Sequence, residues 1–137
     1  MIYMTPENIS AGVAQMEEIR AALKRFKESG KPVVAYCRTF GNGSYYIASV
    51  ADKIILDPAS ESMINGLSSQ MVFYKDILDA LGVDIQLIRH GKYKAAGEPF
   101  IRSSASPENR LQNQELIGSI WNTMATEIAQ SRGCTIS

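Results

Sequence analysis

The chain has little of several residue types that would point to particular functions. Its 137 residues include two cysteines and one histidine, and the formal net charge at pH 7 is zero. Cys37 and Cys134 form no Cys-x-x-Cys pair and no histidine cluster accompanies them, so we expect no zinc site or other metal centre. Cys37 falls in a predicted core strand, where we expect a small buried hydrophobe rather than half of a disulfide.

Long apolar runs and basic stripes are also missing. No stretch of about 18 apolar residues occurs, so the sequence predicts no transmembrane helix. Residues 1–4 lack the charged and apolar regions of a signal peptide, and we expect none there. Lysine and arginine are scattered without interleaved aromatics, which gives no support for a nucleic-acid partner.

The composition that remains is that of a globular domain, with 45% hydrophobic and 20% charged residues. A helix is predicted from Thr5-Pro6-Glu7, an N-terminal helix signature, to the stop at Ser29-Gly30-Lys31-Pro32. The prediction rests on apolar residues that recur every three or four positions, namely Ile9, Val13, Met16, Ile19, Leu23 and Phe26.

Strand-like and helical segments alternate along the rest of the chain. Strands are expected at residues 33–37, 53–56 and 83–88, and helices at residues 45–51, 70–81 and from Ser106-Pro107-Glu108 onward. This order predicts an α/β fold with a mostly parallel sheet flanked by helices. Because the chain opens on a helix, we expect residues 1–137 to be a single partial domain that lacks its first strand or strands.

The segment Gly91-Lys92-Tyr93-Lys94-Ala95-Ala96-Gly97 follows the last predicted strand. A lysine placed there, before small residues, is expected to be half buried. A lysine amine acts as a base only when neutral, and burial favours the neutral form. Lys92 and Lys94 point the same way in an extended segment, so spacing alone does not choose between them, and two solvated lysines remain the simpler alternative.

Several segments, taken in order, resemble the signal peptide peptidase A family, whose members are membrane-bound serine peptidases with a Ser/Lys dyad. They are residues 26–35, residues 45–54, Gly91-Lys92-Tyr93-Lys94, Glu98-Pro99-Phe100-Ile101-Arg102 and the helix opened by Ser106-Pro107-Glu108. The resemblance implies the ClpP/crotonase-type α/β fold. It also implies that this chain is the N-terminal half of a long, two-repeat member whose serine lies in the C-terminal half.

The resemblance assigns the general base to Lys94, the lysine just after the tyrosine, and implies no cofactor. Where the family has Ser-Gly-Gly-Tyr, this chain has Asn42-Gly43-Ser44-Tyr45. Asn42 cannot be a hydrolytic nucleophile, and a helix N-cap explains Ser44 better than a nucleophile does. The resemblance further implies cleaved signal peptides as substrates, a homo-oligomer, and the outer side of the bacterial cytoplasmic membrane, with the anchor outside residues 1–137.

Two other readings stay open. The chain can be a non-catalytic repeat that serves as an oligomerisation scaffold, or an acyl-CoA enzyme of the crotonase type, which rests on fold analogy alone and which the lysine segment argues against. Minor candidates have simpler explanations as well. His90 is expected at an exposed strand end, Glu98 in a loop, and Asn65-Gly66 in a plain turn. The aromatic residues Tyr36, Phe40, Tyr45 and Tyr46 are expected to pack beneath the Gly-rich turn rather than to line a peptide groove.

Overall fold

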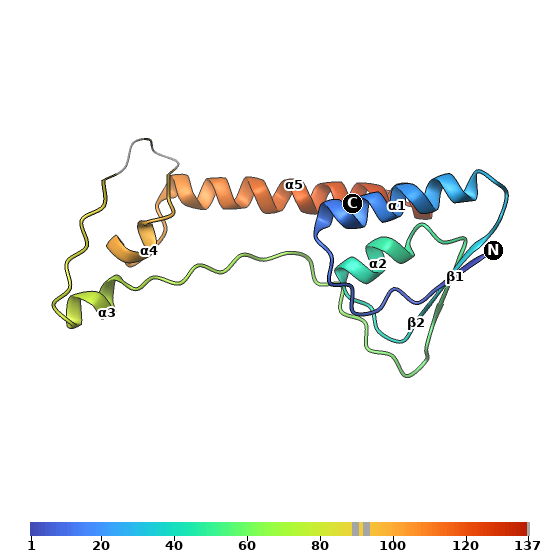
Figure 1. Ribbon diagram of the computed structural model, residues 1–137, viewed down its shortest axis with the longest axis horizontal. Helices are drawn as coiled ribbons and strands as arrows, with labels where there is room; N and C mark the ends of the chain where they lie inside the picture. The colour runs from blue at the N-terminus through green and yellow to red at the C-terminus, as the bar shows by residue number, and fades with distance from the viewer. Residues whose placement is uncertain (89–90, 92–93, 137) are drawn as a thin grey trace. The chain divides into compact units, whose positions relative to one another are not determined.

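A three-stranded parallel sheet organises the N-terminal part of the computed structural model, which describes residues 1–88, 91 and 94–136 (Figure 1). Ile2 lies opposite Val33, and Ala35 lies opposite Ile54. The parallel sheet with its flanking helices confirms the predicted α/β class. The strands stand in the order β1 (Ile2–Met4), β2 (Val33–Cys37) and β3 (Lys53–Leu56).

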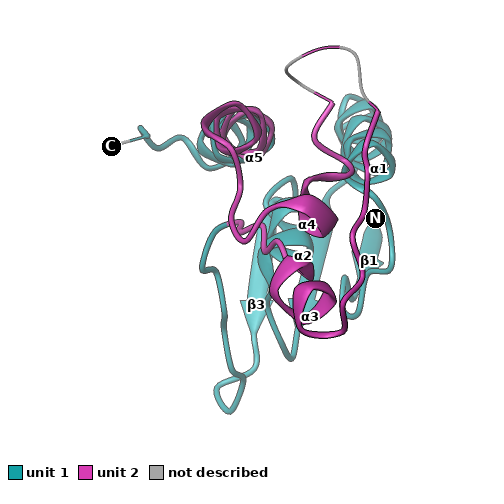
Figure 2. Ribbon diagram, turned by 90° about the vertical axis from the view of Figure 1, so that its left-hand side faces the viewer, with its two compact units in different colours: residues 1–66, 120–137 teal, residues 67–119 magenta. Residues whose placement is uncertain are grey.

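The chain divides into two compact units, which Figure 2 colours separately. Unit 1 contains residues 1–66 and 120–137, and unit 2 contains residues 67–119. Unit 1 holds the sheet and the main core.

The central strand β2 carries the core of unit 1. Val33, Ala35 and Cys37 are completely buried, as expected of a strand covered on both faces. The thiol of Cys37 is free, in agreement with its predicted role as a small buried hydrophobe. The start of the strand is fixed by the carboxylate of Asp52, which accepts a hydrogen bond of 2.8 Å from the backbone N–H of Val33.

Helix α1 (Val13–Lys27) begins later than the sequence predicts. Its N-cap is Gly12, whose N–H donates to the side chain of Gln15 at 2.9 Å. Glu7 does not stabilise a helix N-terminus; its carboxylate accepts hydrogen bonds from the backbone N–H and the guanidinium of Arg38. Asn8 adopts a φ of 51°, which is incompatible with a helix at that point and explains the late start.

Helix α2 (Asn42–Ala48) begins earlier than predicted, at the N-cap Gly41. Ser44 therefore lies inside the first turn, and its predicted capping role is wrong. Gly43 lets α2 approach α1 closely, because a Cβ at this position would lie 3.0 Å from the sulfur of Met16. Gly43 in the Gly-rich turn thus serves helix packing.

Unit 2 contains two short helices and the first half of a long one. Helix α3 (Lys75–Ala80) is shorter than the predicted helix 70–81 and has no buried residue. Helix α4 (Glu98–Ile101), with Pro99 in its first turn, was not predicted. The two are joined by stacked rings of Tyr74 and Phe100, with centroids 5.8 Å apart, and by a 2.7 Å bond from the Tyr74 N–H to the Pro99 carbonyl.

The predicted strand at residues 83–88 does not form. Its apolar residues are exposed, with Ile88 at 92%. A strand needs a neighbour for its backbone hydrogen bonds, and the described residues of unit 2 form no strand that could provide one. The apolar pattern of residues 83–88 was therefore not sufficient to predict a strand.

Helix α5 (Pro107–Arg132) confirms the predicted last helix. Ser106 caps it, since its hydroxyl oxygen accepts a 3.2 Å bond from the Asn109 N–H. Among the described residues, no helix combines the length and the apolar character needed to cross a membrane.

Candidate active site

Lys94 lies beside a hollow of about 430 Å³ in unit 2. Its N–H faces the carbonyl of Gly91 at 3.5 Å, and its side chain is exposed, whereas partial burial was predicted. The burial prediction failed because it assumed that residues 83–88 form a buried strand. His90 and Lys92 lie outside the described residues. The hollow is lined by Lys94, Ala95, Ala96, Asn109, Gln112, Asn113 and Leu116.

Among the described residues that line this hollow there is no carboxylate; apart from the lysine they offer neutral amides and apolar groups. The amides of Asn109 and Asn113 are ordered by each other, because Asn113 Nδ2 donates to Asn109 Oδ1 at 2.8 Å and to the Asn109 carbonyl at 2.9 Å. Of the described residues that line the hollow, Lys94 is the one with an ionisable side chain.

Glu98 is the main correction to the predicted surroundings of the lysine. It is not a loop acid, because it begins α4 and is completely buried. Its carboxylate accepts hydrogen bonds from the Ser106 N–H at 3.0 Å, the Ser106 hydroxyl at 2.6 Å and the Asn109 amide at 3.0 Å. Sequence reasoning missed this role, because only the folded chain brings Glu98 and the cap residue Ser106 together.

Asn42 occupies the position at which the resemblance expects the nucleophile, and it belongs to unit 1. Its Nδ2 donates a 2.6 Å bond to the carbonyl of Gly66, while its Oδ1 is buried and has no hydrogen-bond partner among the described residues. Gly66 adopts a φ of 79°, which requires glycine. The residues predicted as a plain turn thus present a carbonyl to Asn42.

A buried arginine on α1 holds helix α2 in place. Arg20 is 1% exposed, and its guanidinium donates to the Tyr46 carbonyl, to Ser49 Oγ at 2.6 Å and to Glu127 Oε2 at 2.8 Å. It also lies 4.2 Å from the centroid of the Tyr46 ring. Sequence reasoning missed this residue, since a buried arginine looks like any surface arginine on a helix.

The Glu127 carboxylate completes this cluster. Burial alone would raise its pKa, but hydrogen bonds from the Tyr46 hydroxyl at 2.6 Å and from Arg20 outweigh burial and lower it. Burial and the bond to Glu127 raise the pKa of the Tyr46 phenol. In this cluster the neutral Tyr46 phenol contacts both the Arg20 guanidinium and the Glu127 carboxylate. These contacts hold helices together.

The Gly-rich turn borders a second hollow, of about 450 Å³, in unit 1. Phe40 lines it and packs edge-to-face on Tyr45, with ring centroids 5.5 Å apart. Tyr46 is completely buried in the core, and the Tyr36 hydroxyl donates to Asp57 at 2.9 Å. Packing, as predicted, is the role of most of these aromatic side chains.

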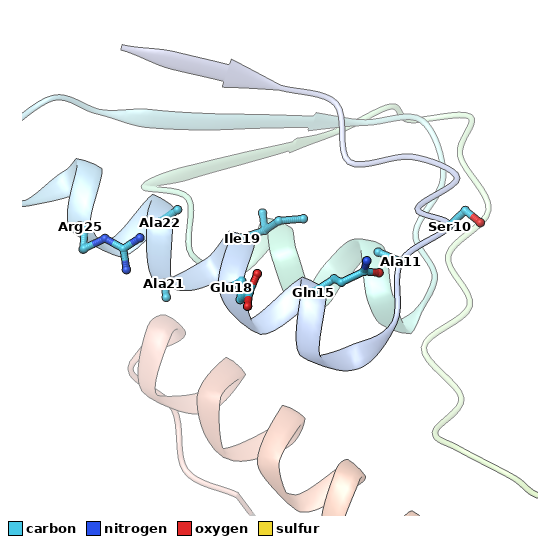
Figure 3. A pocket seen from close by; sticks show the side chains of 8 residues that line it. All are labelled: Ser10, Ala11, Gln15, Glu18, Ile19, Ala21, Ala22 and Arg25. Atoms are coloured by element: carbon cyan, nitrogen blue, oxygen red, sulfur yellow. The ribbon is translucent and has the colours of Figure 1, made fainter.

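A larger hollow of about 650 Å³ lies along α1 (Figure 3). Glu18, Ile19 and Arg25 project from the helix beside alanines, and Ser10 stands before it. Of the residues that the structure describes, no lysine or histidine lines this hollow to activate the Ser10 hydroxyl. The volume of a hollow therefore does not by itself select a candidate active site. We consider the smaller hollow beside Lys94 as the candidate.

Comparison with known proteins gives the class to which this fold and lysine segment belong. The model of peptidase family S49 matches residues 25–137. The chain is 37% identical over 122 residues to Protease 4 of Haemophilus influenzae, covering 89% of this chain and 20% of that protein. It is 38% identical to Protease 4 of Salmonella typhi, with 85% and 19% covered, and 30% identical to the chloroplastic serine protease SPPA of Arabidopsis thaliana, with 96% and 20% covered.

The chain belongs to peptidase family S49, a family with a ClpP-like fold, and the resemblance to signal peptide peptidase A is confirmed. It spans about a fifth of the length of these curated relatives. Asn42 lies in unit 1 and Lys94 in unit 2.

Proposed function

We propose that this chain supplies the general-base lysine of a composite Ser/Lys peptidase site, with the nucleophilic serine in another half of a longer protein. The observation that carries the proposal is Lys94 in its amide-lined hollow, within a chain of family S49. In the reaction, the serine hydroxyl passes its proton to the Lys94 amine as its oxygen attacks the peptide carbonyl. Lys94 then returns the proton to the leaving amine, and water releases the acyl group by the same route.

Because Lys94 is exposed, the proposal places a requirement on the half of the longer protein that carries the serine. A lysine accepts a proton only in its neutral form, which burial favours. Because Lys94 is exposed in this chain, the proposal requires the serine-bearing half to cover the hollow and remove water from it. The site would thus become competent only when both halves meet.

The turn around Asn42 supports a division of labour between the halves. A carboxamide cannot be deprotonated to a hydrolytic nucleophile at neutral pH, and the Asn42 amide is engaged by the Gly66 carbonyl. We therefore expect the isolated chain to have no peptidase activity. Turnover of a peptide by the pure chain that is lost in Asn42→Ala or Ser44→Ala would contradict this expectation.

The substrates and location of the longer protein are part of the same proposal. We propose that it degrades remnant signal peptides as a membrane-associated homo-oligomer, with its catalytic part on the outer side of the bacterial cytoplasmic membrane. The support is the similarity to Protease 4 of two bacteria. No cofactor takes part in the proposed reaction.

Replacing Lys94 by alanine in the full-length protein tests the catalytic role. General acid–base groups contribute about 10²- to 10⁴-fold to rates, so kcat on a fluorogenic peptide should fall by about that factor while circular dichroism stays unchanged. Lys31→Ala, which removes an exposed lysine from a turn in unit 1, is the matched control. Unchanged turnover by a folded Lys94→Ala variant would rule out Lys94 as the general base.

The scaffold function is the second candidate, and the exposed apolar residues of unit 2 favour it. Ile77 and Leu81, four residues apart on or beside α3, are 61% and 71% exposed, and grouped exposed apolar side chains mark interaction surfaces. Covering them in an assembly would remove this surface from water. Leu81→Asp should then shift the full-length protein to smaller species in sedimentation, and an unchanged distribution would speak against this surface as a contact.

A further inference from the structure

A buried acid four residues after Lys94 has no part in the proposed proton transfer. Glu98 has no exposed surface, and an ionised side chain is rarely buried unless several donors compensate it. Three donors from the start of α5 do so here, at 2.6 to 3.0 Å. The acid lies at the N-terminus of a 26-residue helix, whose dipole also favours a negative charge.

The backbone of Glu98 belongs to the turn that directly follows Lys94, the lysine turn. Its N–H donates to the Ala95 carbonyl at 2.9 Å, which closes a turn directly after Lys94, and its carbonyl accepts from the Arg102 N–H at 3.0 Å. One residue therefore joins the lysine turn, through its backbone, to the cap of α5, through its side chain. The path of the chain at Lys94 depends on this junction.

The same carboxylate orders the amide wall of the hollow, formed by Asn109 and Asn113. It accepts from Asn109 Nδ2, while Asn109 Oδ1 accepts from Asn113, and both asparagines line the hollow with Lys94. Glu98 therefore holds both the lysine turn, through its backbone, and the amide wall, through its carboxylate. Loss of that group would loosen both sides of the hollow at once.

We propose that Glu98 is a positioning residue, which fixes the turn of Lys94 against the amide wall of Asn109 and Asn113. The inference rests on the proposed function, because it gives Glu98 a role only if Lys94 is the base. Glu98 itself does not touch the substrate or exchange a proton with it. Its effect should therefore appear in kcat rather than in substrate binding.

Two substitutions at this site separate the contributions of its hydrogen bonds. Glu98→Ala removes the carboxylate and with it the contacts to Ser106 and Asn109. Glu98→Gln keeps the length of the side chain, and its single carbonyl oxygen can still accept from Asn109 Nδ2 and the Ser106 N–H, with its NH₂ group toward the Ser106 hydroxyl. The expected order of kcat is wild type, then Glu98→Gln, then Glu98→Ala.

The experiment measures kcat and KM of the full-length protein on a fluorogenic peptide, with circular dichroism and melting temperature for each variant. Misplacement of a reacting group by about 1 Å costs about 10²-fold. We expect kcat to fall about 10- to 100-fold in Glu98→Ala and less in Glu98→Gln, with KM within about threefold. Glu115→Gln, an exposed acid on α5, is the matched control and should leave both constants unchanged.

Lys94→Ala, measured in parallel, separates the two ideas. Suppose that Lys94→Ala abolishes turnover while the folded Glu98 variants have the kcat of the wild type. The positioning role of Glu98 is then overturned, and Lys94 remains the proposed general base. If Lys94→Ala is fully active, the proposed function fails first. A rise in KM with unchanged kcat would also overturn the inference. Should Glu98→Ala not fold, Glu98→Gln carries the test alone, because it preserves the shape of the side chain.

Discussion

Replacing Arg20 by alanine should cost unit 1 much of its stability. Arg20 is 1% exposed, and its guanidinium connects helix α1 to the Tyr46 carbonyl, to Ser49 and to Glu127. Alanine removes the charge and every one of these donors. It leaves the Glu127 carboxylate without its cationic partner and leaves a space where the arginine stem lay.

The size of the effect follows from how deeply the remaining partner is buried. Breaking a buried ion pair by removing one partner costs about 3–5 kcal/mol. The side chain of Glu127 is 30% exposed, so water can replace part of what Arg20 provided. We therefore expect the lower end of that range, a loss of about 3 kcal/mol in the free energy of unfolding.

Urea denaturation of the 137-residue chain measures this loss. Trp121 is the only tryptophan of the chain and lies in unit 1, so its fluorescence follows the unfolding of that unit. Arg25→Ala, an exposed arginine on the same helix, is the control and should barely move the midpoint. If Arg20→Ala loses no more stability than Arg25→Ala, the cluster does not hold the helices together, and the argument from its geometry is wrong.

Three further predictions concern titration and reactivity. The raised pKa of the Tyr46 phenol means that stability is full below pH 10 and falls as the pH rises further, because the phenol of the unfolded chain ionises near its usual pKa of 10.0. Urea midpoints across alkaline pH should show this fall in wild type and not in Tyr46→Phe, and equal slopes would contradict it. The lowered pKa of Glu127 contributes stability above the unfolded value of 4.5 that is lost as the pH falls through the folded value, so Glu127→Gln should show a weaker acid dependence. Burial raises the pKa of the Cys37 thiol while Cys134 is exposed, so a thiol reagent should modify one cysteine in the folded chain and two in urea. Rapid modification of both in the folded chain would refute the burial of Cys37.

Local patterns in the sequence were enough for some elements. Strand β2 and helix α5 were predicted because a β-branched run and a capped apolar periodicity are properties of neighbouring residues. The early part of α1 was mispredicted because Glu7 pairs with Arg38, which lies on a distant part of the chain. The strand at residues 83–88 failed for a related reason, since a strand exists only with a neighbour.

The sequence by itself determined the α/β class, the family and the lysine segment, because these depend on the order and spacing of residues along the chain. Only the tertiary structure decided that Glu98 is buried, that Arg20 joins three elements and that Lys94 is exposed. The physical reason is that burial and hydrogen bonding of a charged side chain depend on which segments meet in space. A glutamate in a loop and a glutamate anchoring a helix cap look alike until the chain folds.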